Sequence, residues 1–125
     1  MIFGCLDTLG GQAGDIARTC WLAAGLPEHV PGTTIDRQCG SAQQAIHFAA
    51  QALIAGVQDV VVAGGVQQMS LIPIQSTWTA GVQYGFDDPF SGSEGWTKRF
   101  GDQEVSQFNG AELMAKKWGP GCSRR

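Results

Sequence analysis

The sequence predicts an α/β protein in which helices cover a mostly parallel sheet. Residues 33–38 begin with β-branched side chains, residues 41–55 carry apolar side chains at helical spacing, and residues 59–63 are mainly valine. Strand, helix and strand therefore follow one another along the chain. A continuous apolar strand such as Val-Val-Val-Ala is typical of a parallel sheet that is covered on both faces. We interpret residues 33–63 as one βαβ unit.

A first helix is predicted from about Gln12 to Ala24. Its apolar side chains recur at helical spacing, at Ala13, Ile16, Ala17, Cys20, Trp21 and Ala24. Gly25 and Pro27 follow and favour a helix end. Because Cys20 belongs to the apolar side of this helix, we expect its thiol to lie in the core.

The helix predicted over 41–55 carries a full apolar stripe. Its members are Ala42, Ala45, Ile46, Ala49, Ala50, Leu53 and Ile54. The alanines among them predict close packing against a neighbouring element. Gly56 suits the position just after the helix end.

The second part of the chain is less regular. Residues 71–105 contain two prolines, several glycines and scattered aromatic side chains, which predict a long irregular segment held by aromatic anchors. A last helix is predicted over 107–118. These patterns divide the chain into a partial core at 1–71, a loop region with a helix at 72–119, and an off-pattern tail at 120–125.

Composition excludes several classes of function. The chain has 125 residues, 43% of them hydrophobic, which suits one globular domain. Its net charge is −3 and 15% of its residues are charged, so it lacks the basic footprint of a nucleic-acid-binding protein. No apolar run approaches the roughly 20 residues that cross a bilayer, and the start lacks the basic region of a signal peptide. We therefore expect a cytoplasmic protein.

The four cysteines are Cys5, Cys20, Cys39 and Cys122. They form no Cys-x-x-Cys pair and no cluster with histidine, so no metal site is expected. A disulfide framework is not expected in a reducing compartment either. Each thiol is then a small buried hydrophobe or a reactive group.

Cys39 differs from the other cysteines in its local context. It lies between the predicted strand and the first turn of the helix that begins at Ser41. Unpaired N–H groups and the helix dipole favour negative charge there, and helix N-termini lower thiol pKa values. Gly40 allows a close approach, and Ser41 or Cys39 itself is a possible helix cap. The pattern fits a nucleophile on a strand–turn–helix, although a buried cysteine at an element boundary shows the same pattern.

A cysteine nucleophile needs a base, and neither histidine is an evident one. His47 lies in the same predicted helix, with its backbone roughly 12 Å from that of Cys39, and falls outside the apolar stripe. His29 lies in a loop, where histidines are more often solvated. The residues alone therefore provide a nucleophile without a partner.

Two motifs of this chain carry a resemblance to a known family. Residues 37–45, Arg-Gln-Cys-Gly-Ser-Ala-Gln-Gln-Ala, resemble the active-cysteine signature of thiolases, and residues 59–73 resemble the glycine-rich strand end that follows it in that family. The spacing between the two motifs also agrees. Residues 4–31 and 101–108 look like bacterial 3-ketoacyl-CoA thiolases, closest to the branch that acts on bulky acyl chains, including sterol side chains.

The resemblance implies a layered thiolase fold, of which this chain would form a partial N-terminal half with a mixed, mostly parallel sheet. The cysteine matching Cys39 attacks a 3-ketoacyl-CoA, releases acetyl-CoA and holds the shortened acyl chain as a thioester until free CoA removes it. The reverse reaction is a Claisen condensation. The backbone N–H of that cysteine helps to form an oxyanion hole. Coenzyme A is a substrate, no metal or other cofactor is used, and family members are homodimers or homotetramers.

The chain also departs from the family pattern. Ala42 stands where thiolases usually have Gly or Ser, and the usual Glu after the Gly-Gly pair is replaced within Gln67-Gln68, which removes a possible charge. The family's catalytic histidine and its second catalytic cysteine have no match, and Cys122 is not assigned as the acid. We therefore expect this chain alone to be inactive or nearly so.

Three alternatives stay open. A condensing enzyme of the ketoacyl synthase type would share the fold and the cysteine, although the Gly-Gly-Val-Gln-Gln-Met-Ser run favours a thiolase. A non-catalytic truncated remnant would fit the tail after Gly119, which departs from the family. A nucleotide-binding domain would fit Gly64-Gly65 after a strand, but the chain has no Gly-x-Gly-x-x-Gly motif.

Overall fold

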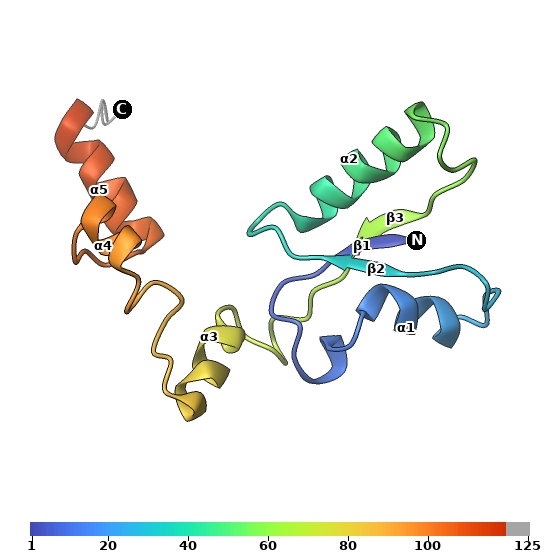
Figure 1. Cartoon of the computed structure of the whole chain (residues 1–125), viewed down its shortest axis with the longest axis horizontal. Coiled ribbons are helices and arrows are strands. Elements are labelled where there is room, and N and C mark those ends of the chain that lie inside the picture. Colours follow the sequence, from blue (N-terminus) through green and yellow to red (C-terminus); the bar gives the residue numbers. More distant parts are fainter. Residues whose placement is uncertain (120–125) are drawn as a thin grey trace, which may run out of the picture. The chain divides into compact units, whose positions relative to one another are not determined.

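A computed structural model describes residues 1–119. Contacts divide the chain into two compact units, one over Met1–Pro89 and one that begins at Phe90. The first unit contains the sheet and Cys39, and the second contains the last two helices (Figure 1).

Three short parallel strands form the sheet of the first unit. β1 is Ile2–Gly4, β2 is Thr33–Ile35 and β3 is Ala63–Gly65. β1 lies in the middle, with Ile2 opposite Thr33 on one side and opposite Ala63 on the other. Because all three strands run in the same direction, the loops that follow them leave the sheet at one edge. Ligands of open α/β sheets bind at such carboxyl edges.

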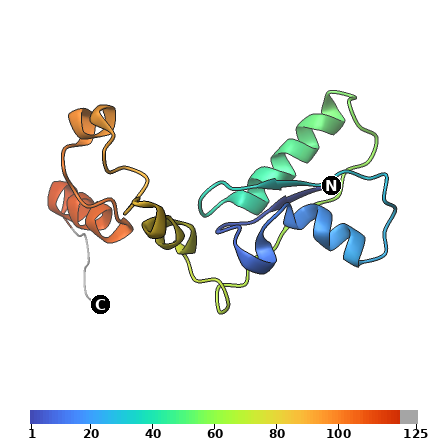
Figure 2. The ribbon, with the colours of Figure 1, turned by 60° about the horizontal axis from the view of Figure 1, so that its bottom comes forward.

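Two helices cover opposite faces of this sheet. α1 is Ile16–Ala23 and packs on β2 and β1, whereas α2 is Ser41–Ile54 and packs on β1 and β3. Figures 1 and 2 show the strands between the two helices. The buried apolar residues are few and come from both helices and from two loops: Cys5, Ile16, Ala17, Ala45, Ala49 and Ile72. The layered α/β class and the strand–helix–strand order are therefore confirmed.

The remaining elements are short helices. A 3-10 turn, η1, covers Gly10–Gln12, and α3 at Ser76–Gly81 continues into η2 at Val82–Tyr84. In the second unit, α4 is Glu94–Phe100 and α5 is Gln107–Trp118. Serine caps both of these helices, because Ser93 accepts a hydrogen bond from the Trp96 N–H and Ser106 accepts one from the Asn109 N–H.

The predicted boundaries of the first helix and of two strands were wrong by a few residues. The first helix begins at Ile16 because Gly14 and Asp15 have positive φ values of 66° and 62°. The strand predicted over 33–38 ends at Ile35. The strand predicted over 59–63 was misplaced: β3 covers Ala63–Gly65, and the valines before it lie outside the residues that pair with β1.

The apolar stripe of α2 is only partly buried, as expected for a partial fold. Ala45 and Ala49 are buried against the sheet, but Ile46, Leu53 and Ile54 are exposed on the same helix. Cys20, expected in the core, is only partly buried. The sheet is three strands wide, so it covers one side of α2 and leaves the rest of the stripe in solvent.

The segment at 71–105 is less irregular than predicted, because it contains α3, η2 and α4. The predicted aromatic anchors are present in its last part. Trp96 lies with its ring centroid 4.4 Å from that of Phe90 and 4.5 Å from that of Phe100. Tyr84 and Phe86, in contrast, are exposed. The helix predicted at 107–118 is confirmed as α5, and the predicted tail at 120–125 lies outside the described residues.

Within residues 1–119, no helix has both the length and the apolar character needed to span a membrane.

Candidate functional site

Cys39 lies in the loop between β2 and α2, two residues before the helix begins. Its φ is 59°, in the left-handed region that residues other than glycine rarely adopt. Its side chain is exposed, so the structure does not support the alternative of a buried cysteine at an element boundary. Backbone strain of this kind often occurs at active sites, where the surrounding structure maintains it.

Hydrogen bonds that join Arg37 to Ser41 and Gly40 close the loop around Cys39. The Ser41 hydroxyl donates to the Arg37 carbonyl at 3.0 Å and accepts from the Arg37 N–H, also at 3.0 Å. The Gly40 N–H donates to the same carbonyl at 2.8 Å. Gly40 is the N-cap of α2, so the expected capping by Ser41 or Cys39 was wrong. Ser41 instead holds the turn that presents Cys39.

Close packing of glycines places the start of α2 at the sheet edge. A Cβ atom at Gly4 would collide with the backbone of Ser41 and Ala42. A Cβ atom at Gly65 would lie 2.7 Å from the Ala42 Cβ. The first turn of α2 therefore lies directly against the carboxyl ends of β1 and β3. Its unpaired N–H groups and the positive end of its dipole are located at that edge.

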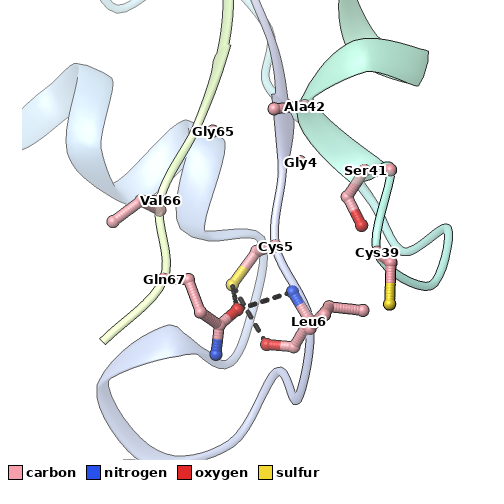
Figure 3. Close-up of a pocket in the computed structure, with 10 residues that line it drawn as sticks. Gly4, Cys5, Leu6, Cys39, Ser41, Ala42, Gly65, Val66 and Gln67 are labelled. Carbon is pink, nitrogen blue, oxygen red and sulfur yellow. Dashed lines mark hydrogen bonds between the residues drawn. The ribbon is translucent and has the colours of Figure 1, made fainter. Parts of the chain in front are cut away.

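A pocket of about 330 Å³ opens at this edge (Figure 3). Three segments that are distant in sequence line it: residues 4–6 at the end of β1, residues 39–42 at the start of α2, and residues 65–67 at the end of β3. Figure 3 shows Cys39 on the α2 side of the pocket and Gln67 on the opposite side. The pocket therefore combines the predicted nucleophile with the glycine-rich strand end.

Gln67 and Cys5 form one wall of the pocket. The Gln67 Oε1 accepts the Leu6 N–H at 2.8 Å and the Cys5 thiol at 3.7 Å, and that thiol also donates to the Leu6 carbonyl at 3.3 Å. Burial raises the pKa of Cys5, and the nearby carboxylates of Asp36 and Asp7 raise that pKa further. Cys5 therefore remains a protonated, buried thiol, whereas Cys39 is exposed.

Behind this wall lies a buried carboxylate that the sequence analysis missed. Asp7 accepts the Gln75 N–H at 3.0 Å, the Thr77 N–H at 2.9 Å and the Thr77 hydroxyl at 2.7 Å. Burial raises the pKa of Asp7, but these three hydrogen bonds outweigh it and the net pKa is lowered. A carboxylate three residues after the end of a strand was the available signal, but β1 itself had not been predicted.

A glutamine completes the connection between the loops after β1 and β3. The Gln12 Nε2 donates to the carbonyls of Leu6 and Asp7, and its Oε1 accepts the Gln68 N–H at 2.8 Å. Together with Gln67, it ties the two loops at the back of the pocket. No local sequence pattern around Gln12 predicts this role.

The charged groups at the pocket are few. Arg37 lies against Gly40, because a Cβ there would collide with the Arg37 Nη1. His29 and His47 are exposed, and neither belongs to the pocket lining within residues 1–119. That part of the chain also holds no group of three or more His, Cys, Asp or Glu side chains that could bind a metal ion. Cys122 lies outside the described residues.

Residues 1–117 match the family model described as the N-terminal domain of thiolase. This chain belongs to the thiolase family. It is 63% identical over 118 residues to a steroid 3-ketoacyl-CoA thiolase of Mycobacterium tuberculosis, covering 94% of this chain and 29% of that protein. It is 39% identical over 114 residues to a 3-oxoadipyl-CoA/3-oxo-5,6-dehydrosuberyl-CoA thiolase of Escherichia coli, covering 91% of this chain and 28% of that protein.

The chain spans less than a third of the length of these thiolases. The thiolase match includes both motifs that line the pocket, the loop of Cys39 and the strand end at Gly64-Gly65. It confirms the predicted family and the partial N-terminal thiolase fold. It also removes the nucleotide-binding alternative, which rested on Gly64-Gly65 alone.

Proposed function

We propose that Cys39 is the nucleophile of a thiolase-type acyl transfer from a 3-ketoacyl-CoA. The observation that carries the proposal is the placement of an exposed thiol, on a left-handed turn, directly before the N-terminus of α2 and beside a pocket. A thiolate is the reactive form of cysteine, and a helix N-terminus favours negative charge.

In the proposed reaction, the Cys39 sulfur bonds to the keto carbon and the bond between that carbon and the α-carbon breaks. The leaving acetyl-CoA takes up a proton at its α-carbon, and the shortened acyl group stays on sulfur. The thiol of free CoA then attacks the thioester and restores Cys39. The resemblance to thiolases assigns oxyanion stabilisation to the Cys39 N–H, where a preorganised donor would stabilise the developing charge.

This reaction needs a group that takes the proton of the Cys39 thiol and a group that protonates the leaving acetyl-CoA. Within residues 1–119, the pocket lining contains no histidine. We therefore propose that residues 1–119 supply the nucleophile and part of the pocket, and that turnover needs acid–base groups from elsewhere. A non-catalytic role of this chain is the competing proposal, favoured by the same lack of a neighbouring base.

We also propose a substrate class. The relative with 63% identity is named a steroid 3-ketoacyl-CoA thiolase, which supports a bulky, sterol-derived acyl chain on CoA. A degradative role, a cytoplasmic location and assembly into homodimers or homotetramers belong to the same proposal.

Intact-mass analysis after incubation with acetoacetyl-CoA tests the role of Cys39. We expect an acetyl adduct of about 42 Da on the native chain, and none on Cys39→Ala, because the thioester forms on that sulfur. Cys20→Ala is the matched control, since Cys20 lies on α1 and does not line the pocket, and it should still form the adduct.

An adduct that persists in Cys39→Ala would contradict the assignment of the nucleophile. No adduct on the native chain would mean that acylation of Cys39, as well as turnover, needs groups from outside residues 1–119, and would favour a non-catalytic role for this chain alone.

A further inference from the structure

The Gln12 side chain is buried next to the pocket, and both ends of its amide are hydrogen-bonded. It is 5% exposed. Its Nε2 group donates to the Leu6 carbonyl at 3.3 Å and to the Asp7 carbonyl at 3.1 Å, and its Oε1 accepts the Gln68 N–H at 2.8 Å. Because a backbone N–H only donates and a carbonyl only accepts, these three partners fix which end of the amide faces which loop. Gln12 therefore joins the loop after β1 to the loop after β3 in one defined geometry.

The two loops that Gln12 joins also hold the thiol of Cys5. The Cys5 Sγ donates to the Leu6 carbonyl at 3.3 Å and to the Gln67 Oε1 at 3.7 Å (Figure 3). Gln12 is bonded to the same Leu6 carbonyl and to Gln68, the residue that follows Gln67. It therefore fixes the backbone beside both acceptors of the thiol. Cys5 belongs to the pocket wall and yet is 1% exposed.

A second accessible thiol in this pocket would interfere with the proposed reaction. In that reaction the acyl group is held on Cys39 as a thioester. If the Cys5 thiol reached this thioester, its sulfur would bond to the acyl carbon and the bond to the Cys39 sulfur would break. The proton of the Cys5 thiol would pass to Cys39. The acyl group would then be held away from the N-terminus of α2.

We propose that Gln12 is a positioning residue that keeps the Cys5 thiol covered, so that the pocket offers Cys39 alone to an acyl thioester. The inference rests on the proposed function, because a second thiol interferes only if Cys39 forms a thioester. Gln12 does not itself line the pocket, so it acts through Leu6 and Gln67, which do.

Two variants remove hydrogen bonds of Gln12 while keeping a side chain of similar length. Gln12→Met has no polar group for any of the three partners. Gln12→Glu keeps an acceptor for the Gln68 N–H, but its carboxylate cannot donate to the two carbonyls. Ile16→Val is the control, because Ile16 is buried on α1 and does not line the pocket. It lowers stability by loss of a methyl group and removes no hydrogen bond.

The measurement is the rate at which iodoacetamide modifies Cys5, divided by the rate for Cys39, both resolved by peptide mass. We expect each Gln12 variant to raise this ratio about tenfold or more, because loss of one or two buried hydrogen bonds makes local opening of the wall more populated. Ile16→Val should lower the unfolding temperature but leave the ratio within about twofold. An unchanged ratio in both Gln12 variants, or an equal rise in Ile16→Val, would overturn the inference.

The native chain provides a test that does not depend on the folding of a variant. The Gln68 N–H donates to Gln12, although Gln68 itself is exposed. We expect hydrogen exchange at this amide to be slowed about tenfold or more relative to an unstructured peptide. Exchange as fast as in an unstructured peptide would show that Gln12 does not hold the loop, and would overturn the inference even if both Gln12 variants fail to fold.

Neither measurement requires acyl transfer, so each is independent of the proposed reaction. If acetoacetyl-CoA leaves no adduct on the native chain but the ratio rises in the Gln12 variants, the covering of Cys5 by Gln12 stands and the proposed function fails. If the adduct forms and the ratio does not change, the reverse holds. If both results are as expected, the acetyl label should occur on Cys5 as well as Cys39 in Gln12→Met, and a label on Cys39 alone would overturn the inference.

Discussion

Cys5 and Cys39 line the same pocket, yet their surroundings give them different chemistry. Cys5 is 1% exposed, and its pKa is raised by burial and then by Asp36 and Asp7. Cys39 is exposed on a left-handed turn at the start of a helix. Reactivity of a thiol follows both access and the ease of forming the thiolate. We therefore propose Cys39 as the reactive thiol of the pocket, whereas the buried Cys5 packs inside the first unit.

Asp7 supports the pocket from behind through three hydrogen bonds, so replacing it should destabilise the chain. Asp7→Asn should lower the free energy of unfolding by about 1–3 kcal/mol at neutral pH, because three donors lose a charged acceptor. Since the pKa of Asp7 is lowered in the folded state, its stabilisation is present above the ordinary value of 3.8 and is lost as the pH falls below it.

Urea unfolding of the native chain and of Asp7→Asn, at neutral pH and below pH 3.8, checks this expectation. The difference between the two proteins should shrink in acid. Asp59→Asn is the control, because Asp59 is exposed. Equal losses in both variants would contradict the structural role of Asp7.

At the scale of elements, glycine contacts hold α2 against the sheet. Gly4→Ala should destabilise the chain by about 2–4 kcal/mol, because its Cβ would meet the backbone of Ser41 and Ala42, which cannot move aside as a flexible side chain can. It should also change the alkylation rate of Cys39, since the start of α2 is displaced. Gly11→Ala is the matched control, with no atom within 4 Å of its added Cβ.

Circular dichroism during thermal unfolding and peptide-resolved alkylation would measure both effects. A Gly4→Ala variant as stable as Gly11→Ala would show that the close approach of β1 and α2 is not needed.

The elements that the sequence predicted best are those defined by local patterns. α2 and α5 follow from helical periodicity and from the glycines after them, and their starts match the predicted ones. β1 was missed because three residues give too short a pattern. The position of β3 depends on its register with β1, which no local signal provides.

The candidate site also contains some features that local sequence patterns predict and others that they do not. Cys39 could be chosen from its place between a strand and a helix. The wall formed by Gln67 and Cys5 could not be predicted from the sequence. It depends on the hydrogen bond between Leu6 and Gln67, which lie 61 positions apart.

At the scale of the whole molecule, much apolar surface is exposed on the first unit. Ile54 is 88% exposed and Val60 is 84% exposed, whereas Ala45 on the same helix as Ile54 is fully buried. Large exposed apolar patches promote association. We expect the purified chain to self-associate, and the double variant Ile54→Glu with Val60→Lys to associate less while keeping its free energy of unfolding.

Sedimentation velocity at several concentrations checks this expectation. Ala45→Glu should instead unfold the chain, because it buries an unpaired charge. A native chain that stays monomeric across the concentration range would show that these side chains do not drive association.

We propose that the fold presents Cys39, among its described cysteines, as the nucleophile. The most direct test is the rate at which iodoacetamide modifies Cys5, Cys20 and Cys39, resolved by peptide mass, with and without acetoacetyl-CoA. We expect Cys39 to react first, and we expect acetoacetyl-CoA to slow the modification of Cys39 but not that of Cys5 or Cys20. Faster modification of Cys5 or Cys20, or no effect of acetoacetyl-CoA on Cys39, would contradict this proposal.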